Sequence, residues 1–170
     1  MTFFDRLLSR RNANEAVRPL YNAVVAKARE AHWYVDGGVA DTIDGRFEMI
    51  AAMLSLIVAR LELDADRRQE VAWLVELFVD DMEGQLRQIG IGDMVVGKHV
   101  GRMIGAFGGR IGAYRQGLKD GGIEAALLRN LYAGVPPTSA ALDHTAERLR
   151  SLHLRLHSTA ADAILEGRLP

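Results

Sequence analysis

The sequence predicts an all-α fold, a single compact helical domain of five to seven helices. Apolar residues recur every three or four positions through most of the chain, which is the spacing of one face of an α-helix. Paired glycines and one pair of prolines interrupt that spacing at a few points, where turns are expected. The 170 residues, 49% apolar and 25% charged, are enough for one ordinary globular domain with a substantial core.

The bulk properties exclude several classes of protein. A net charge of −1 gives no general attraction to nucleic acid or anionic lipid, and the lack of cysteine excludes disulfides and thiolate metal sites. The longest uncharged run near the front, residues 49–59, is shorter than the roughly 20 residues of a membrane-spanning helix and predicts a buried helix instead. With no signal peptide visible, we expect a bacterial cytoplasmic protein, with peripheral contact at the inner membrane left open.

Residues 1–12 are expected to form a basic amphipathic N-terminal segment. Such a segment can lie on a membrane surface, pack as a helix against the domain, or fray as a chain end. The residues that would contact the membrane are Phe3, Phe4, Leu7, Leu8, Arg10 and Arg11.

The helical domain is expected to span residues 13–134. Its first helix should begin at Asn12 or Asn14, which are good N-caps, and fade near Tyr34. After a glycine turn at residues 36–38, the next helix should start with Asp44 as its N-cap and reach about Leu63.

Two further helices are expected to meet at a tight corner. Asp64 or Asp66 should start a helix that ends near Gln88, and its segment VAWLVELFV, apolar nearly all round, predicts a central, buried position. Glu83 and Arg87 have the i,i+4 spacing of a helical ion pair. IGIGD then makes the corner, with Gly90 as C-cap and Asp93 as the next N-cap.

The helix predicted from Asp93 to Lys119 carries two stripes. One is apolar, and the other, roughly 100° away on helical geometry, consists of glycines. An interior glycine costs about 0.5–1 kcal/mol relative to alanine, so five on one face indicate close approach of another backbone. Either a neighbouring helix of the same domain packs there, which we favour, or a partner's helix docks there. The glycines are Gly97, Gly101, Gly105, Gly108 and Gly112.

The end of the chain is expected to form a short helix and then a long one. Residues 123–132 have helical spacing, and the prolines at 136 and 137 end that segment. A C-terminal helix at residues 138–166, capped by Thr138 or Ser139, has a coiled-coil-like apolar seam. It either closes the domain, which we favour, or swings out toward a partner.

No arrangement of residues converges on an active site. His153 and His157 are four apart, but no glutamate of an HExxH motif lies between them, so a solvated helix face explains them better than a metal site. Asp41, Asp44 and Glu48 match no calcium loop, and capping accounts for them more simply. We therefore expect a non-enzyme without metal or cofactor. Arg46, just inside a helix start, opposes the helix dipole and predicts a specific carboxylate partner.

Two blocks of sequence carry a family resemblance. DTIDGRFE begins at Asp41, and LRQIGIGDMVVGK followed by FGGRIGAY begins at Leu86. With these blocks in order, the chain resembles the ubiquinol–cytochrome c chaperone family over about residues 21–132. It departs from the family pattern at Gln88, Ile89 and Gly108, where the family has Glu, Met and Tyr.

The resemblance implies a chaperone for assembly of the cytochrome bc1 complex that binds newly made cytochrome b. A small partner subunit or the ribosome is implied as a further partner, as in the mitochondrial members. A lipid- or quinone-binding helical protein at the membrane surface and a metal-dependent helical enzyme remain alternatives. The residues expected to bind a partner are Arg46, Glu48, Arg87, Asp93, Lys98, Gly101, Arg102, Gly105, Arg110 and Tyr114.

Overall fold

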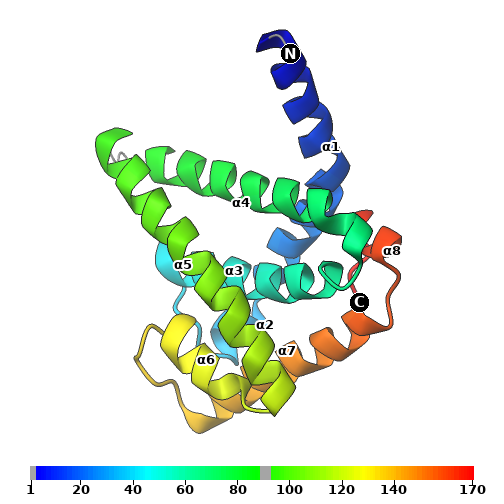
Figure 1. Cartoon of the computed structure of the whole chain (residues 1–170). Coiled ribbons are helices and arrows are strands. Elements are labelled where there is room, and N and C mark those ends of the chain that lie inside the picture. The colour runs from blue at the N-terminus through cyan, green and yellow to red at the C-terminus, as the bar shows by residue number, and fades with distance from the viewer. Residues whose placement is uncertain (1–2, 89–92) are drawn as a thin grey trace.

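The chain folds into an all-α domain, as predicted. The computed structural model describes residues 3–88 and 93–170, with side chains throughout those ranges except at 3–14, 86, 93–100 and 102–104. Within them there are eight α-helices, one 3-10 turn and no strand (Figure 1). They are α1 (Phe3–Ala28), α2 (His32–Val35), α3 (Ile43–Leu61), η1 (Ala65–Arg67), α4 (Arg68–Gln88), α5 (Asp93–Asp120), α6 (Ile123–Asn130), α7 (Ser139–His157) and α8 (Ala161–Leu165).

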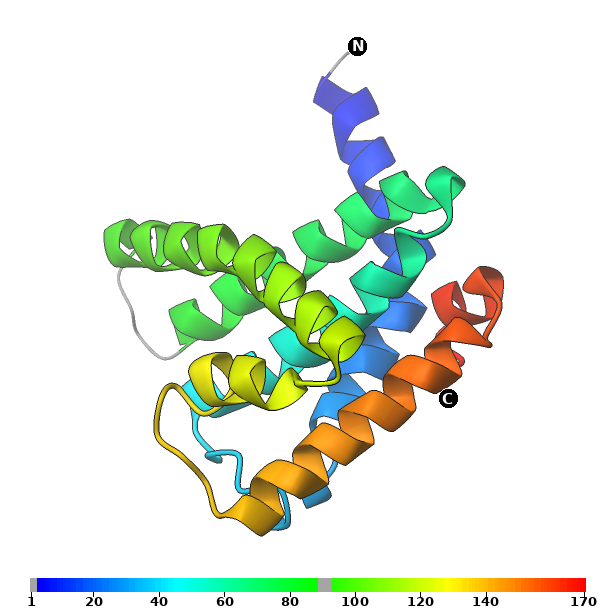
Figure 2. The ribbon, with the colours of Figure 1, turned by 60° about the horizontal axis from the view of Figure 1, so that its bottom comes forward.

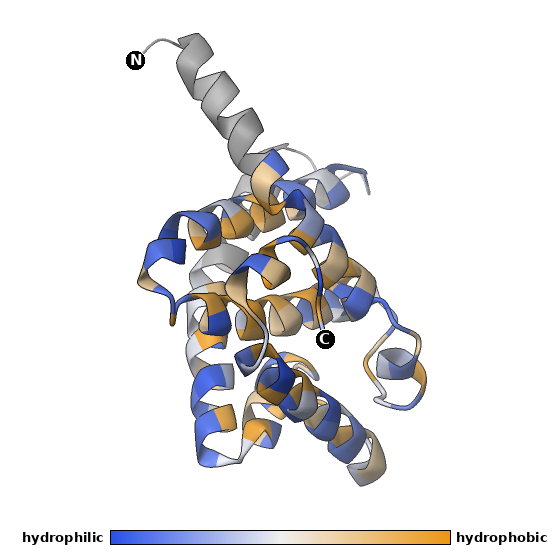
Figure 3. Ribbon diagram, turned by 90° about the vertical axis from the view of Figure 1, so that its right-hand side faces the viewer, coloured by the Kyte–Doolittle hydropathy of each residue, from blue (hydrophilic) through white to orange (hydrophobic). Residues whose placement is uncertain are grey.

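The central helix is α3. Every residue from Met49 to Val58 is buried, because α1, α4, α5 and α7 all contact α3. Figure 2 shows α5 and α7 on either side of it, and in Figure 3 the hydrophobic positions gather in the middle of the molecule. The expectation that the VAWLVELFV segment of α4 is central was wrong. Trp73 and Val75 are only partly buried, since α4 lies on the outside of the domain and packs through one face, mainly against α1 and α5.

The first helix is longer at its start and shorter at its end than expected. It runs unbroken from Phe3 to Ala28, and Pro19 lies in its interior. The leucines and arginines before Asn12 are good helix formers, so nothing in that segment ends the helix. Packing of α1 against α3, α4 and α8 overrides the local cost of the proline. The chain then turns before α2.

The start of α3 is fixed by Thr42 rather than by Asp44. The Thr42 side chain accepts a hydrogen bond from the Gly45 backbone N–H at 3.1 Å, which is the N-cap interaction. Gly45 cannot be replaced without movement, because a Cβ there would lie 2.0 Å from the Ala40 carbonyl oxygen. The first turn of α3 is thus held closely against the preceding loop.

The C-terminal segment closes the domain but is not one helix. It breaks after His157 into α7 and α8, and α7 packs against α3 and α6 while α8 packs against α1. The Thr138 side chain caps α7, as expected. This break, together with the separate α2, brings the described helices to eight instead of five to seven. The predicted seam faces the core through the buried residues Thr145, Leu149, Leu152 and Leu156.

A buried polar contact joins α7 to the loop before α3. The Tyr132 hydroxyl donates to the Gly37 carbonyl oxygen at 2.6 Å and lies 2.9 Å from the Thr145 hydroxyl. All three groups are satisfied inside the core, where an unpaired polar group would be costly.

None of the described helices is long and apolar enough to cross a membrane.

Candidate functional site

Helix α5 has one face in the core. Phe107 and Tyr114 are 4% and 1% exposed, and Ile111 and Leu118 pack partly buried beside them, so the described part of the predicted apolar stripe points inward. Phe107 lies 5.3 Å from Phe78 of α4, ring centre to ring centre, and Phe78 stacks at 5.4 Å on Phe47 of α3. These three rings join α3, α4 and α5. Phe47 and Phe107 belong to the two sequence blocks that carry the family resemblance.

The opposite face of α5 is bare backbone open to solvent. Five glycines of α5 are exposed, and a Cβ placed on any of them would meet no described atom within 4 Å beyond its own helix. Packing against a neighbouring helix of the same domain, which we favoured, is therefore wrong for these positions. Gly97 lies in the part of α5 whose side-chain surroundings are not described. The five are Gly101, Gly105, Gly108, Gly109 and Gly112, and we call them the glycine face.

Gly117, in the same helix, shows what internal packing looks like. A Cβ at Gly117 would lie 2.9 Å from the Ile123 Cα and 3.2 Å from the Gly122 carbonyl oxygen, where the chain turns into α6. Close approach within the domain therefore occurs at one end of α5 and not along the glycine face.

A bidentate ion pair lies at the edge of the glycine face. The Arg110 guanidinium donates through Nε to the Glu48 carboxylate at 2.8 Å, and a second bond joins Arg110 Nη2 to the other carboxylate oxygen. Both side chains are mostly buried, and the Arg110 guanidinium carbon lies 5.8 Å from the centre of the Phe47 ring. Burial raises the pKa of the Glu48 carboxyl, while the bonds from Arg110 oppose that rise. The pair fixes α5 to the first turns of α3.

Arg46 has the carboxylate partner that its position predicted. Its Nε donates to Asp41 at 2.6 Å, and this bond lowers the pKa of the Asp41 carboxyl. The pair borders a hollow of about 460 Å³ that Arg29, Tyr34 and Val35 also line, and Val35 is 78% exposed. Because Arg46 is two residues before Glu48, both ion pairs lie at the N-terminal end of α3.

The other candidate residues are placed differently. Tyr114 is a core residue, so its side chain is not available on the surface as a partner contact, and burial raises the pKa of its hydroxyl. Arg87 is exposed near the end of α4 and pairs with Glu83 at 3.8 Å, as its spacing predicted. The side chains proposed for partner or membrane contact that lie outside the described residues are those of Asp93, Lys98, Arg102, Phe3, Phe4, Leu7, Leu8, Arg10 and Arg11.

The histidine pair of α7 forms no metal centre among the described residues. The rings of His153 and His157 lie 4.5 Å apart, edge to face, and no described group of three metal-ligating side chains contains them. Sequence reasoning missed the ring stack of Phe47, Phe78 and Phe107, because three aromatic residues on three helices give no local signal.

Two comparisons with known proteins found matches. The sequence model of the ubiquinol–cytochrome C chaperone family matches residues 35–169, so the match extends through α7 and α8, beyond the 21–132 expected from the motifs. The crystal structure of the Cbp3 homolog from Brucella abortus is similar, with a TM-score of 0.77 and 27% sequence identity. The alignment covers 99% of this chain and 95% of that one. No curated protein matches the chain.

Proposed function

The chain belongs to the ubiquinol–cytochrome C chaperone family and is an assembly chaperone of the cytochrome bc1 complex, and we propose that its client is newly made cytochrome b. The client would be held on the outer surface of α5. In Figure 1, α5 forms a hairpin with α4 and lies far from α8.

The observation that carries this proposal is the open glycine face. A row of glycines weakens a helix, by about 0.5–1 kcal/mol for each, and no contact within the described domain compensates for them. Where side chains are absent, the backbone of a second helix can approach closely, as in small-residue contacts between membrane helices. An apolar helical segment of cytochrome b, not yet inserted among its own neighbours, has the surface that fits this face.

Charged residues around the glycine face would orient the client. Arg110 is paired with Glu48, so it contributes a fixed polar group, and not a net charge, at the edge of the glycine face. Arg46 with Asp41 extends the charged border along the start of α3. Lys98 and Arg102, placed on α5 by sequence, would add to it.

The remaining partner assignments follow from the same family. A small partner subunit or the ribosome would bring the chaperone to nascent cytochrome b. The basic N-terminal segment would hold it at the cytoplasmic face of the inner membrane. The role is one of binding, in which we assign no catalytic residue, cofactor or metal.

A bulky side chain on the glycine face tests the proposal. A tagged chain expressed in a host with a bc1 complex is used to capture cytochrome b from membranes solubilised in mild detergent. Gly105→Leu should abolish capture while the protein remains folded, because leucine fills the space that the client helix needs.

Gly84→Leu is the matched control. Gly84 lies on α4, also with no described atom within 4 Å of its Cβ position, so the same substitution should leave capture intact. Equal recovery of cytochrome b by Gly105→Leu and the unaltered chain would remove the glycine face from the proposal. Recovery of no bc1 component by the unaltered chain would remove the client.

A further inference from the structure

A basic groove lies on another part of the molecule, where α3 ends, α4 begins, and α5 and α7 end. Its volume is about 650 Å³. None of the residues that line it belongs to the glycine face or its charged border. The polar residues that line it are Glu62, Arg68, Arg115, Lys119, His153 and His157.

The groove holds more positive than negative charge. Arg115 pairs with Glu62, which neutralises one of its three cations. Arg68 and Lys119 are exposed and make no ion pair or hydrogen bond with any described residue. Two cations that share a cavity without a counter-ion repel each other, and an anion between them relieves that repulsion.

His153 adds hydrogen-bonding capacity rather than charge. Burial, and then the neighbouring His157, lower the pKa of the His153 imidazole, so this ring is neutral at neutral pH. Its Nδ1 is inaccessible to solvent and has no hydrogen-bond partner among the described residues. Because that nitrogen is closed to solvent, His153 can contact a ligand in the groove only through the rest of its ring.

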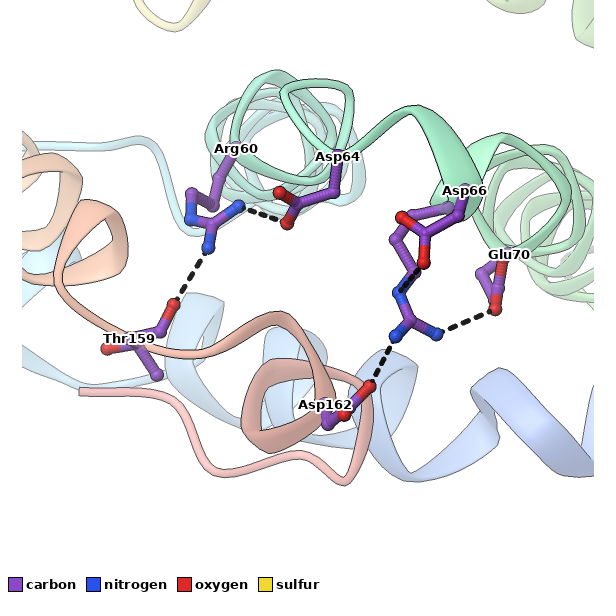
Figure 4. A network of polar contacts seen from close by, with 7 residues as sticks. Arg60, Asp64, Asp66, Glu70, Thr159 and Asp162 are labelled. Atoms are coloured by element: carbon purple, nitrogen blue, oxygen red, sulfur yellow. Dashed lines mark hydrogen bonds and ion pairs between the residues drawn. The ribbon is translucent and has the colours of Figure 1, made fainter.

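The walls of the groove are held by partly buried polar contacts between α3, α4 and the C-terminal segment (Figure 4). Arg60 of α3 donates to the carbonyl oxygens of Leu156 and Thr159, each at 3.0 Å, and pairs with Asp64 at 2.7 Å. These bonds anchor the C-terminal end of α7, where His157 lies, to α3. The groove is thus formed before any ligand enters, which lowers the entropy lost on binding.

A second set of contacts fixes the start of α4. Arg67 pairs with Asp162 of α8 at 2.7 Å and with Glu70 at 3.3 Å, and Arg68 is the next residue in the chain. Leu63, 62% exposed, lies beside these cations as an apolar edge of the groove.

We propose that this groove binds a phosphate group, carried by a soluble phosphoester or by a phospholipid headgroup. Phosphate oxygens accept hydrogen bonds from guanidinium and ammonium groups at once, and three helices, α4, α5 and α7, supply donors here. Arg68 and Lys119 would hold the charge, and the exposed Leu63 would contact the apolar part of the ligand. This inference goes beyond the proposed function and does not depend on the client.

Titration calorimetry with glycerol 3-phosphate, at fixed sodium chloride concentration, tests the site. We expect saturable binding that inorganic phosphate displaces and that the double variant Arg68→Gln, Lys119→Gln weakens by about tenfold or more. The double variant Arg129→Gln, Arg148→Gln carries the same charge change at exposed residues outside the groove and should bind as the unaltered chain does. Thermal unfolding confirms that both variants fold.

Co-sedimentation with phosphatidylglycerol vesicles, and with phosphatidylcholine vesicles as reference, distinguishes the two sources of phosphate. If the groove variant loses phosphatidylglycerol binding and the control variant keeps it, the headgroup is a ligand. If only binding of glycerol 3-phosphate depends on the groove residues, the ligand is a soluble phosphoester. If neither binding distinguishes the groove variant from the control variant, the phosphate site does not exist.

Discussion

Alanine on the glycine face of α5 should stabilise the protein. At Gly101, Gly105, Gly108 and Gly112, a Cβ meets no described atom within 4 Å, so the methyl group adds no clash. Each substitution reduces the freedom of the unfolded chain and should raise the free energy of unfolding by about 0.5–1 kcal/mol. Four together should give about 2–4 kcal/mol, which corresponds to a rise of roughly 4–16 °C in the melting temperature for a chain of this length.

Urea denaturation followed by far-ultraviolet circular dichroism measures the effect. The same helix supplies the contrast, because a methyl group at Gly117 would lie 2.9 Å from the Ile123 backbone, and Gly117→Ala should therefore destabilise by about 1–3 kcal/mol. A loss of stability in Gly105→Ala comparable to that in Gly117→Ala would refute the reasoning, since it would mean that the glycine face packs inside the domain.

The stabilised variant also separates folding from function. Four added methyl groups would keep a client helix farther from the backbone of α5. We therefore expect the more stable variant to capture less cytochrome b. Sequence positions that are unfavourable for stability and favourable for binding are a common feature of functional surfaces.

Two other contacts give predictions of different kinds. Tyr132→Phe should lower the free energy of unfolding by about 1–2 kcal/mol, because the Gly37 carbonyl loses its 2.6 Å hydrogen bond inside the core. Tyr34→Phe, which removes a hydroxyl bonded to the Ala28 carbonyl at a less buried site, should cost less in the same denaturation assay, and equal losses would contradict the argument. The hydrogen bond from Arg150 lowers the pKa of the Glu124 carboxyl, so its contribution to stability is present above the pKa of the unfolded chain, about 4.3, and is lost as the pH falls through the lower folded value. In Arg150→Gln, nuclear magnetic resonance titration should show the pKa of Glu124 raised, and an unchanged value would exclude Arg150 as the cause.

Local sequence signals predicted the helices well where one residue decides a boundary. Thr138 and the proline pair before it placed the start of α7, and the uncharged run at residues 49–59 placed the buried part of α3. Where several weak signals competed, the outcome depended on the rest of the domain. Asn12 and Asn14 are good caps, yet α1 continues through them because helix formers precede them, and it continues through Pro19 because three other helices pack against α1.

The contacts of the candidate site also divide into those that the sequence predicted and those that it could not predict. The pairing of Arg46 with a carboxylate followed from its place in the first turn of α3, where a cation is unfavourable alone. The pairing of Arg110 with Glu48 did not, because the two residues are 62 positions apart and meet only when α5 crosses α3. The basic groove was also beyond prediction, since its cations come from separate helices.

The sequence alone determined that the chain is helical, which family it resembles, and that one helix has an apolar stripe beside a glycine stripe. Those properties depend on spacing along the chain, and helical geometry converts spacing directly into faces. Only the tertiary structure decided which face of α5 is covered. Apolar surface must be buried against other helices, so Phe107 and Tyr114 took the core, and the glycine face remained open on the outside of the domain.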